Sequence, residues 1–286
     1  MRRRNSGRNA VIDKDQVKLV VTDEDGTFLD LGGEDFSRER FRAVFDRMRA
    51  AGCRFAVATS NQSFQVSDIF GDMAPRLSII ASNGAYVEPE GAAPRISVMP
   101  PAAVESVLAA HAAHPEVPLC AVCAQGAFVE RGGDPGFVEE MTMYSHNMVH
   151  VGSLAEEAPS SDVLMYWSRV NEDELTATVE LFSAACGHSV SVVDSGFGGG
   201  FGYFDVVQPG VSKATGIRAL MDTFGINASQ VMAFGDAGND ADMLRLAGTG
   251  VAMGNASEEL KAIADLVCDP CEEQGVIKVL EEVFGR

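Results

Sequence analysis

The stretch Val17–Thr27 (VKLVVTDEDGT) joins a short β-branched run to a cluster of acids and a glycine. The run is typical of a buried strand, and the acids mark the point where that strand ends. A helix pattern follows, with Ser37 placed to cap it and apolar side chains in one stripe from Phe41 to Met48. Gly52 then ends the helix. The stretch therefore predicts the first strand and the first crossover helix of an α/β fold.

The same alternation of strand and helix continues along the chain. A strand at Phe55–Thr59, a short helix at Phe64–Phe70 and a strand at Leu77–Ala81 complete a βαβαβ order. This order predicts a parallel sheet with helices on both faces. The C-terminal part returns to the pattern, with elements expected at Ile217–Phe224, Val231–Phe234, Asp240–Leu246, Gly250–Met253 and Ser257–Ala264.

The middle of the chain has a different pattern and holds all 5 histidines and the single tryptophan. Strands such as Val163–Trp167 and Val190–Val193 alternate with helices near residues 101–113 and 172–186. The glycine-rich run Gly196–Gly202 is expected to form a hinge or turn. The middle of the chain thus indicates an α+β region of its own.

We therefore predict an α/β protein with two domains. A Rossmann-like parallel-sheet core would comprise residues 1–86 and 203–286, with residues 1–15 as a flexible tail. An α+β domain of residues 87–202 would be inserted into that core.

The composition limits the partners that this protein can have. The chain has 286 residues, with 22 basic and 41 acidic side chains and a formal charge of −19. Such a surface repels nucleic acid and anionic membranes, so neither is an expected partner. A small phosphorylated substrate is still allowed, because salt screens surface charge over about 8 Å. The apolar run Val17–Val21 is too short for a signal peptide, and we expect a soluble, cytoplasmic protein.

The 6 cysteines include two C-x-x-C pairs, which raise the possibility of a zinc site. One pair lies in a predicted strand at Val117–Val129, where residues three apart point to opposite faces. The other pair, Cys268 and Cys271, is consistent with two thiols in a loop. We therefore do not expect a shared zinc site.

Polar residues stand where three predicted strands end, which is the edge where open parallel sheets bind ligands. They are Asp23–Thr27, Thr59–Asn61 and Gly235–Asp240, and Lys213 begins a helix just before the last of them. Singly, these residues could cap helices or fill turns. Together, the carboxylates would repel one another unless a cation lay among them, and oxygen ligands alone suit Mg²⁺. One carboxylate could then attack phosphorus while a second one moves a proton.

These residues resemble the four motifs of the haloacid dehalogenase (HAD) superfamily of phosphohydrolases: Asp23-x-Asp25-Gly26-Thr27, Thr59, Lys213 and Gly235-Asp236-x-x-Asn239-Asp240. Three further stretches resemble its Cof-type branch, which has a large type-2B cap: residues 82–85 (SNGA), 210–213 (GVSK) and 251–256 (VAMGNA). The similarity covers residues 17–86 and 203–280, whereas the cap matches only in size and position.

The resemblance implies a role for each matching residue. Asp23 would be the nucleophile that forms an aspartyl-phosphate, and Asp25 the general acid and base. The implied metal ligands for Mg²⁺ are Asp23, the backbone carbonyl of Asp25, Asp236, Asn239 and Asp240. The implied contacts to the phosphoryl group and the substrate are Thr59, Ser60, Asn61, Asn83, Gly84, Lys213 and Asn255.

Two positions depart from the family pattern. Glu24 replaces an apolar residue, and Asn61 stands where the Cof-type branch commonly has arginine. The catalytic set is intact, so we expect a Mg²⁺-dependent phosphatase that acts on a small phosphomonoester, with a sugar phosphate as the expected substrate.

Other functions stay open at this point. The alternatives are a phosphosugar mutase of the same superfamily and a catalytically silent protein that binds a phosphorylated ligand. The sequence does not name the substrate, since His146, His150 and Trp167 of the inserted region show no diagnostic pattern. The oligomeric state is also open.

Overall fold

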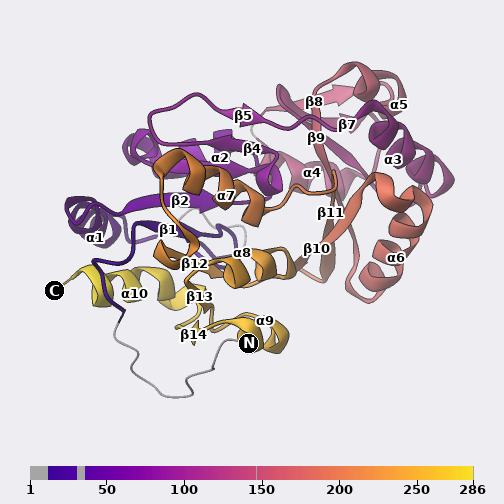
Figure 1. Cartoon of the computed structure of the whole chain (residues 1–286). Helices are drawn as coiled ribbons and strands as arrows, with labels where there is room; N and C mark the ends of the chain where they lie inside the picture. Colours follow the sequence, from indigo (N-terminus) through magenta and orange to yellow (C-terminus); the bar gives the residue numbers. More distant parts are fainter. Residues whose placement is uncertain (1–11, 31–35, 146, 286) are drawn as a thin grey trace. The chain divides into compact units, whose positions relative to one another are not determined.

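The computed structural model describes residues 12–30, 36–145 and 147–285 (Figure 1). The chain divides into two compact units. The first unit comprises Met1–Ala56, Met221–Asp236 and Asp240–Arg286, and the second comprises Val57–Leu220 and Ala237–Asn239. These boundaries differ from those of the predicted insertion at residues 87–202, which stays a prediction.

The larger of two sheets has the strand order β14-β13-β12-β1-β2-β3-β4-β5. In the first unit, β1 (Leu19–Thr22) pairs in parallel with β12 (Val231–Gly235), which pairs in parallel with β13 (Thr249–Ala252). The remaining strands are β14 (Leu266–Val267), β2 (Arg54–Ala58), β3 (Ser78–Ala81), β4 (Tyr86–Glu88) and β5 (Arg95–Ile96). All residues of β1 and β12 are buried, as expected for a parallel sheet covered on both faces. The predicted α/β class is confirmed.

The helices of the first unit bury stripes of apolar side chains. Helix α1 (Arg38–Ala50) buries four apolar side chains, and Gly52 (φ 74°) follows its end. Ser37 is the N-cap residue of α1, but its side chain makes no capping hydrogen bond. Helix α10 (Gly275–Phe284) packs against α1, where Arg40 Nη2 lies 2.6 Å from Glu281 Oε2. The other helices of this unit are α8 (Ala241–Leu246) and α9 (Glu258–Ile263).

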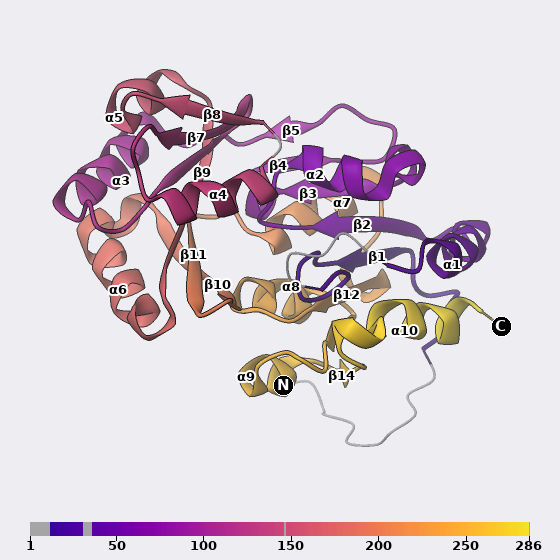
Figure 2. The ribbon, with the colours of Figure 1, turned by 180° about the vertical axis from the view of Figure 1, so that it is seen from behind.

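The second unit contains a six-stranded, mainly antiparallel sheet with the order β10-β11-β9-β6-β7-β8. Its strands are β6 (Cys120–Cys123), β7 (Gly126–Glu130), β8 (Met148–Val151), β9 (Val163–Asn171), β10 (Ser191–Gly198) and β11 (Phe201–Val207). Helices α3 (Pro101–Ala113), α5 (Leu154–Glu157) and α6 (Leu175–Cys186) cover one face (Figure 1). Helix α4 (Pro135–Tyr144) covers the other face (Figure 2). The remaining α-helices of the described residues are α2 (Ser63–Phe70) and α7 (Lys213–Phe224).

The predicted strand at Val117–Val129 is wrong, because this segment is the hairpin of β6 and β7. Gly126 is the first residue of β7, and its backbone lies close to the backbone of Asn147. A Cβ at Gly126 would lie 2.4 Å from Asn147 O. Cys120 and Cys123 nevertheless pack in the two different cores of the sheet, on opposite faces. Burial raises the pKa of Cys123 to about 12.

The run Gly196–Gly202 contains a hairpin turn at Gly199 and Gly200, between the end of β10 and the start of β11. Strands β10 and β11 pair on either side of Gly199 and Gly200, whose φ angles of 62° and 86° favour glycine. Strand β11 crosses the predicted boundary between residues 202 and 203.

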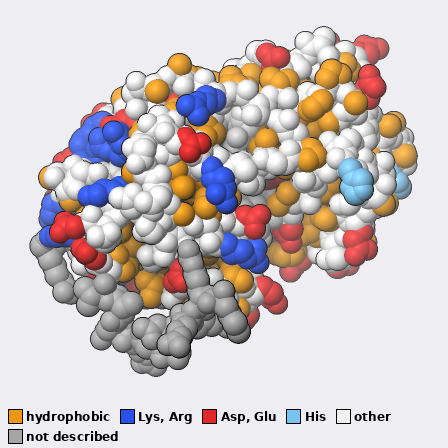
Figure 3. Space-filling model, viewed as in Figure 1, with side chains coloured by type: hydrophobic (Ala, Val, Ile, Leu, Met, Phe, Trp, Pro, Cys, Tyr) orange, Lys and Arg blue, Asp and Glu red, His pale blue; other side chains and the backbone are white. Residues whose placement is uncertain are grey.

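No helix in the described ranges is long and apolar enough to cross a membrane. On the face that Figure 3 shows, acidic side chains are spread widely, while Lys and Arg gather mainly toward one end. His146 and the N-terminal part of the predicted tail lie outside the described residues.

Candidate active site

Three carboxylates meet where β1 and β12 end. Asp23 follows β1, and its backbone N–H donates to Phe234 O at 3.0 Å, while Asp236 follows β12. Oxygen atoms of Asp23, Asp236 and Asp240 all lie within 4.8 Å of one another. Among the described residues, this is the one group of His, Cys, Asp or Glu side chains arranged to hold a metal ion. Asp23 and Asp240 are buried, which makes their mutual repulsion costly without a cation.

Short hydrogen bonds hold this group in place. The Thr27 hydroxyl donates to Asp236 Oδ1 at 2.6 Å, and the Asp236 backbone N–H donates to Asp240 Oδ2 at 2.9 Å. Gly26 has a φ of 75°, and a Cβ there would lie 2.5 Å from Asp236 Oδ2. Glycine is therefore required at this position in the first motif, by both conformation and space.

Backbone hydrogen bonds, most of them to the Glu24 carbonyl group, form the turn after Asp23. Glu24 O accepts from the backbone N–H groups of Phe28 and Leu29, both at 2.9 Å. Asp25, two residues after Asp23 in the sequence, is half-buried in this turn. The Glu24 side chain is fully buried. Glu24 thus buries a polar side chain at the position where the resemblance implies an apolar one.

A second group of candidates lies in the second unit, around the end of β2. The Thr59 backbone N–H donates to Ile80 O at 2.8 Å, and the Thr59 hydroxyl accepts from Asn61 N at 3.0 Å. The Asn83 N–H donates to Thr59 O at 3.0 Å. Asn83 has a φ of 53°, which asparagine tolerates better than most residues. These bonds bring Thr59, Asn61 and Asn83 together, with Ser60 half-buried between the first two.

Lys213 begins α7 and is only 2% exposed. Ser212 and Thr215 cap this helix reciprocally, since Ser212 Oγ accepts from Thr215 N at 3.2 Å and Thr215 Oγ1 accepts from Ser212 N at 2.9 Å. Gly84 lies directly against this cap, because a Cβ on Gly84 would be 2.2 Å from Ser212 O. The close approach explains how Asn83 and Lys213 come into one group.

Substituting Gly84 tests this approach. Gly84→Ala is expected to lower the free energy of unfolding by about 2 kcal/mol or more, because the φ of 99° is strained for alanine and Ser212 must move. Gly91→Ala is the matched control, since Gly91 has a φ of 74° but nothing within 4 Å of an added Cβ. For Gly91→Ala, urea unfolding should show a loss of about 1 kcal/mol in the free energy of unfolding. Equal losses would contradict the steric argument.

Asp205 of β11 joins this second group, although the sequence analysis did not select it. Asp205 Oδ2 accepts from Asn83 Nδ2 and from the Ser195 hydroxyl, and Asn83 Oδ1 accepts from Asn239 Nδ2 at 3.3 Å. Burial raises the pKa of Asp205 to about 6, against the opposing effects of its two hydrogen bonds and the Lys213 charge. The only sequence signal of Asp205 is a lone acid in the apolar strand segment Phe204–Val207.

Asn255 has a different environment from the other candidates. Its Nδ2 donates to Gly26 O at 2.8 Å, and its Oδ1 accepts from Cys271 N at 3.1 Å. Asn255 thus ties the first motif to the loop of Cys271. Burial raises the pKa values of Cys268 and Cys271 to about 12, which leaves both thiols protonated.

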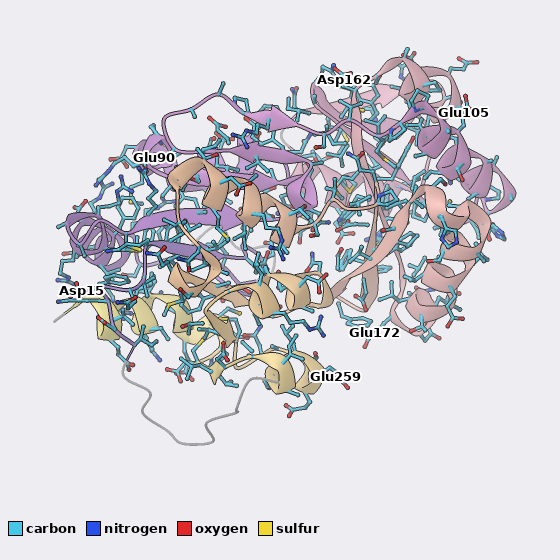
Figure 4. All side chains as sticks on the ribbon, viewed as in Figure 1. Asp15, Glu90, Glu105, Asp162, Glu172 and Glu259 are labelled. Atoms are coloured by element: carbon cyan, nitrogen blue, oxygen red, sulfur yellow. The ribbon has the colours of Figure 1, made fainter. Side chains whose placement is uncertain are left out.

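Many acids of this chain lie away from these groups. Figure 4 labels acids such as Glu105, Asp162, Glu172 and Glu259, all of which are exposed. Exposed carboxylates are hydrated and need no partner. Burial therefore separates the candidate-site aspartates Asp23 and Asp240 from the solvated ones.

Comparison with known proteins identifies the family. A model of haloacid dehalogenase-like hydrolases matches residues 20–280. The chain belongs to this family. The HAD resemblance of the motifs is thereby confirmed, including its Cof-type branch.

Individual known proteins resemble this hydrolase over nearly its whole length. The 5-amino-6-(5-phospho-D-ribitylamino)uracil phosphatase of Escherichia coli is 32% identical over 94% of this chain and 96% of its own. A solved protein of Streptococcus mutans superposes with a TM-score of 0.87 at 25% identity, covering 94% of this chain and 100% of its own. A solved HAD subclass IIB sugar phosphatase gives a TM-score of 0.76 at 26% identity, covering 94% and 99%. This HAD hydrolase is accordingly a phosphoric monoester hydrolase.

Proposed function

We propose that this HAD hydrolase is a Mg²⁺-dependent phosphatase that hydrolyses a small phosphomonoester through an aspartyl-phosphate on Asp23. The observation that carries the proposal is the cluster of Asp23, Asp236 and Asp240, with oxygens within 4.8 Å of one another after two neighbouring parallel strands. A cytoplasmic location and the absence of nucleic-acid partners stay predictions.

The donor set fits a magnesium ion. All of its atoms are oxygens, which hard cations prefer, and no His or Cys side chain joins the cluster among the described residues. We assign Asp23, Asp236, Asp240, the Asp25 carbonyl and Asn239 as the residues that would hold it. Asn239 Oδ1 is buried and has no hydrogen-bond partner within the described part of the chain, so it is available as a ligand. Bound Mg²⁺ would supply positive charge to the phosphoryl oxygens.

The proposed reaction uses two carboxylates in turn. An Asp23 oxygen attacks phosphorus, its bond to phosphorus forms, and the bond from phosphorus to the leaving oxygen breaks. Asp25 gives that oxygen a proton. Asp25 then takes a proton from water, which attacks phosphorus and releases Asp23 and inorganic phosphate. Thr59 and Lys213 hold the phosphoryl group during both steps.

A pocket of about 250 Å³ in the second unit supports an uncharged, hydroxylated leaving group. Two residues that line the pocket are neighbours of candidate residues in the sequence: Gln62 follows Asn61, and Ser82 precedes Asn83. Gln62 is 5% exposed, and its Oε1 has no hydrogen-bond partner among the described residues. The lining carries amide, hydroxyl and apolar groups but no Asp, Glu, Lys or Arg: Gln62, Ser63, Phe64, Ser82, Tyr86, Cys123, Ala124 and Leu164.

We therefore propose a sugar or sugar-alcohol phosphate as the substrate. The name of the Escherichia coli relative includes a phosphorylated ribityl group, which belongs to this chemical class. A panel of hexose, pentose and ribityl phosphates, assayed by phosphate release, tests the proposal. Gln62→Leu should raise KM for the best substrate and leave turnover of a small aryl phosphate unchanged.

Metal removal tests the other half of the proposal. EDTA is expected to lower phosphatase activity about 100-fold or more, because the three aspartates then repel both one another and the phosphoryl group. Adding Mg²⁺ in excess should restore it. Calcium should inhibit, since its looser coordination misplaces the nucleophile. Full activity of the metal-free protein would rule out this mechanism.

A further inference from the structure

Gln62 is a buried amide at the start of a helix, and one end of it has no partner. It is the N-cap residue of α2, lines the pocket of about 250 Å³ and is 5% exposed. Gln62 Nε2 donates to Cys123 O at 3.4 Å, and because a carbonyl oxygen can only accept, the NH₂ end of the amide faces Cys123. Gln62 Oε1 is left over, buried and without a hydrogen-bond partner among the described residues. A buried acceptor without a partner is costly, so Gln62 favours a ligand that brings a donor.

Three other side chains of the lining already give their hydrogens to other groups. Tyr86 Oη donates to Glu88 Oε2 at 2.6 Å, and Cys123 Sγ donates to Ala121 O at 3.7 Å. The Ser63 side chain hydrogen-bonds to Tyr86 and acts to lower the pKa of that phenol, as a donor does. These three side chains therefore offer a ligand acceptor atoms and no free hydrogen.

The pocket also disfavours charge. No Asp, Glu, Lys or Arg lines it, and apolar side chains such as Phe64, Ala124 and Leu164 make up part of its wall. An ionised group would lose its hydration there without meeting an opposite charge. The pocket thus fits a neutral group that donates a hydrogen bond. Within the proposed class of substrates, such a group is a hydroxyl.

We propose that Gln62 is a specificity-determining residue that selects substrates whose leaving group directs a hydroxyl O–H at Gln62 Oε1. The inference rests on the proposed function and deepens it, because it assigns the polarity of one contact to the leaving group. A methyl ether at the same position would set one acceptor against another, and a methyl group would leave Oε1 without a partner. All the residues of this argument belong to the second unit.

Phosphate esters of simple diols test this polarity on the unmodified protein. Hydroxyalkyl phosphates with a terminal hydroxyl and chains of two to six carbons are compared with their terminal methyl ethers, by kcat/KM for phosphate release. At the chain length that reaches the pocket, the free hydroxyl should be preferred about 10- to 100-fold, the usual range for one hydrogen bond to a buried group. Alkyl phosphates with a methyl group in place of the hydroxyl should be as poor as the ethers.

Gln62→Met removes the amide and keeps the length of the side chain, so the preference for the hydroxyl should disappear. Gln65→Met is the matched control. Gln65 lies in the same helix, is 8% exposed and also has an Oε1 without a hydrogen-bond partner in the described ranges, but it does not line the pocket. Gln65→Met should therefore keep the full preference.

Equal kcat/KM for hydroxyl, ether and alkyl esters at every chain length would overturn the inference, and this comparison needs no variant to fold. A preference that survives in Gln62→Met would overturn the assignment to Gln62. If the unmodified protein releases phosphate neither from these esters nor from an aryl phosphate, the proposed function fails instead.

Discussion

Asp23→Asn is expected to lower kcat by on the order of 10⁴-fold or more and to leave no phosphorylated enzyme. Asparagine keeps the shape of Asp23 but has no carboxylate oxygen to attack phosphorus. Water could replace the nucleophile only slowly, because it would lack the positioning of a side chain anchored at the end of β1. Rapid quenching with a ³²P-labelled aryl phosphate, followed by denaturing gel electrophoresis, measures the labelled protein directly.

Stability measurements separate loss of chemistry from loss of folding. Because oxygens of Asp23, Asp236 and Asp240 lie within 4.8 Å of one another, removing one charge relieves repulsion in the metal-free protein. Asp23→Asn should therefore melt in EDTA at the same temperature as the unmodified protein or higher. Label on the Asp23→Asn protein would show that another residue is the nucleophile.

The parts of the fold that the sequence predicts are those with local signals. The stripe from Phe41 to Met48 and the stop at Gly52 predict α1, which spans Arg38–Ala50. The apolar run at Val231–Phe234 predicts β12, which spans Val231–Gly235. Helix α10 is not among the elements expected from the sequence, although its buried side chains also form a local apolar stripe: Val276, Ile277, Leu280, Val283 and Phe284.

Features that depend on distant partners were not predictable. In the β6–β7 hairpin, Gly126 lies close against the backbone of Asn147, a contact that no local pattern reveals. Asp205 is buried beside Asn83, 122 residues earlier in the chain. A single acid in an apolar strand pattern does not predict which distant side chain will donate a hydrogen bond to it.

The candidate site was predictable to a similar extent. The parallel register that pairs Thr22 with Phe234 explains why Asp23 and Asp236 emerge at the same edge. Motif spacing alone could therefore locate the acid cluster. It could not show that Asn255 ties two loops together, nor that Asn239 bonds to Asn83. The roles assigned to these residues stay proposals.

Asp25→Asn is expected to separate the two halves of the reaction. The variant keeps the Asp23 nucleophile but loses the proton donor for the leaving oxygen and the base for water. General acid–base assistance contributes about 10²- to 10⁴-fold, so hydrolysis of a sugar phosphate, whose alkoxide leaves poorly, should fall by that order. An activated aryl phosphate needs less protonation, so transfer to Asp23 should suffer less.

With such a substrate, Asp25→Asn should accumulate aspartyl-phosphate, because the base that activates water for the second step is missing. Rapid quenching should show a burst of aryl alcohol close to one equivalent per enzyme, followed by slow turnover. Asp23→Asn, treated identically, should show neither burst nor label. Equal losses for sugar and aryl phosphates, with no accumulation of label, would mean that Asp25 does not act as the acid and base. Asp25 would then contribute only through its backbone carbonyl and the shape of the turn that begins at Glu24.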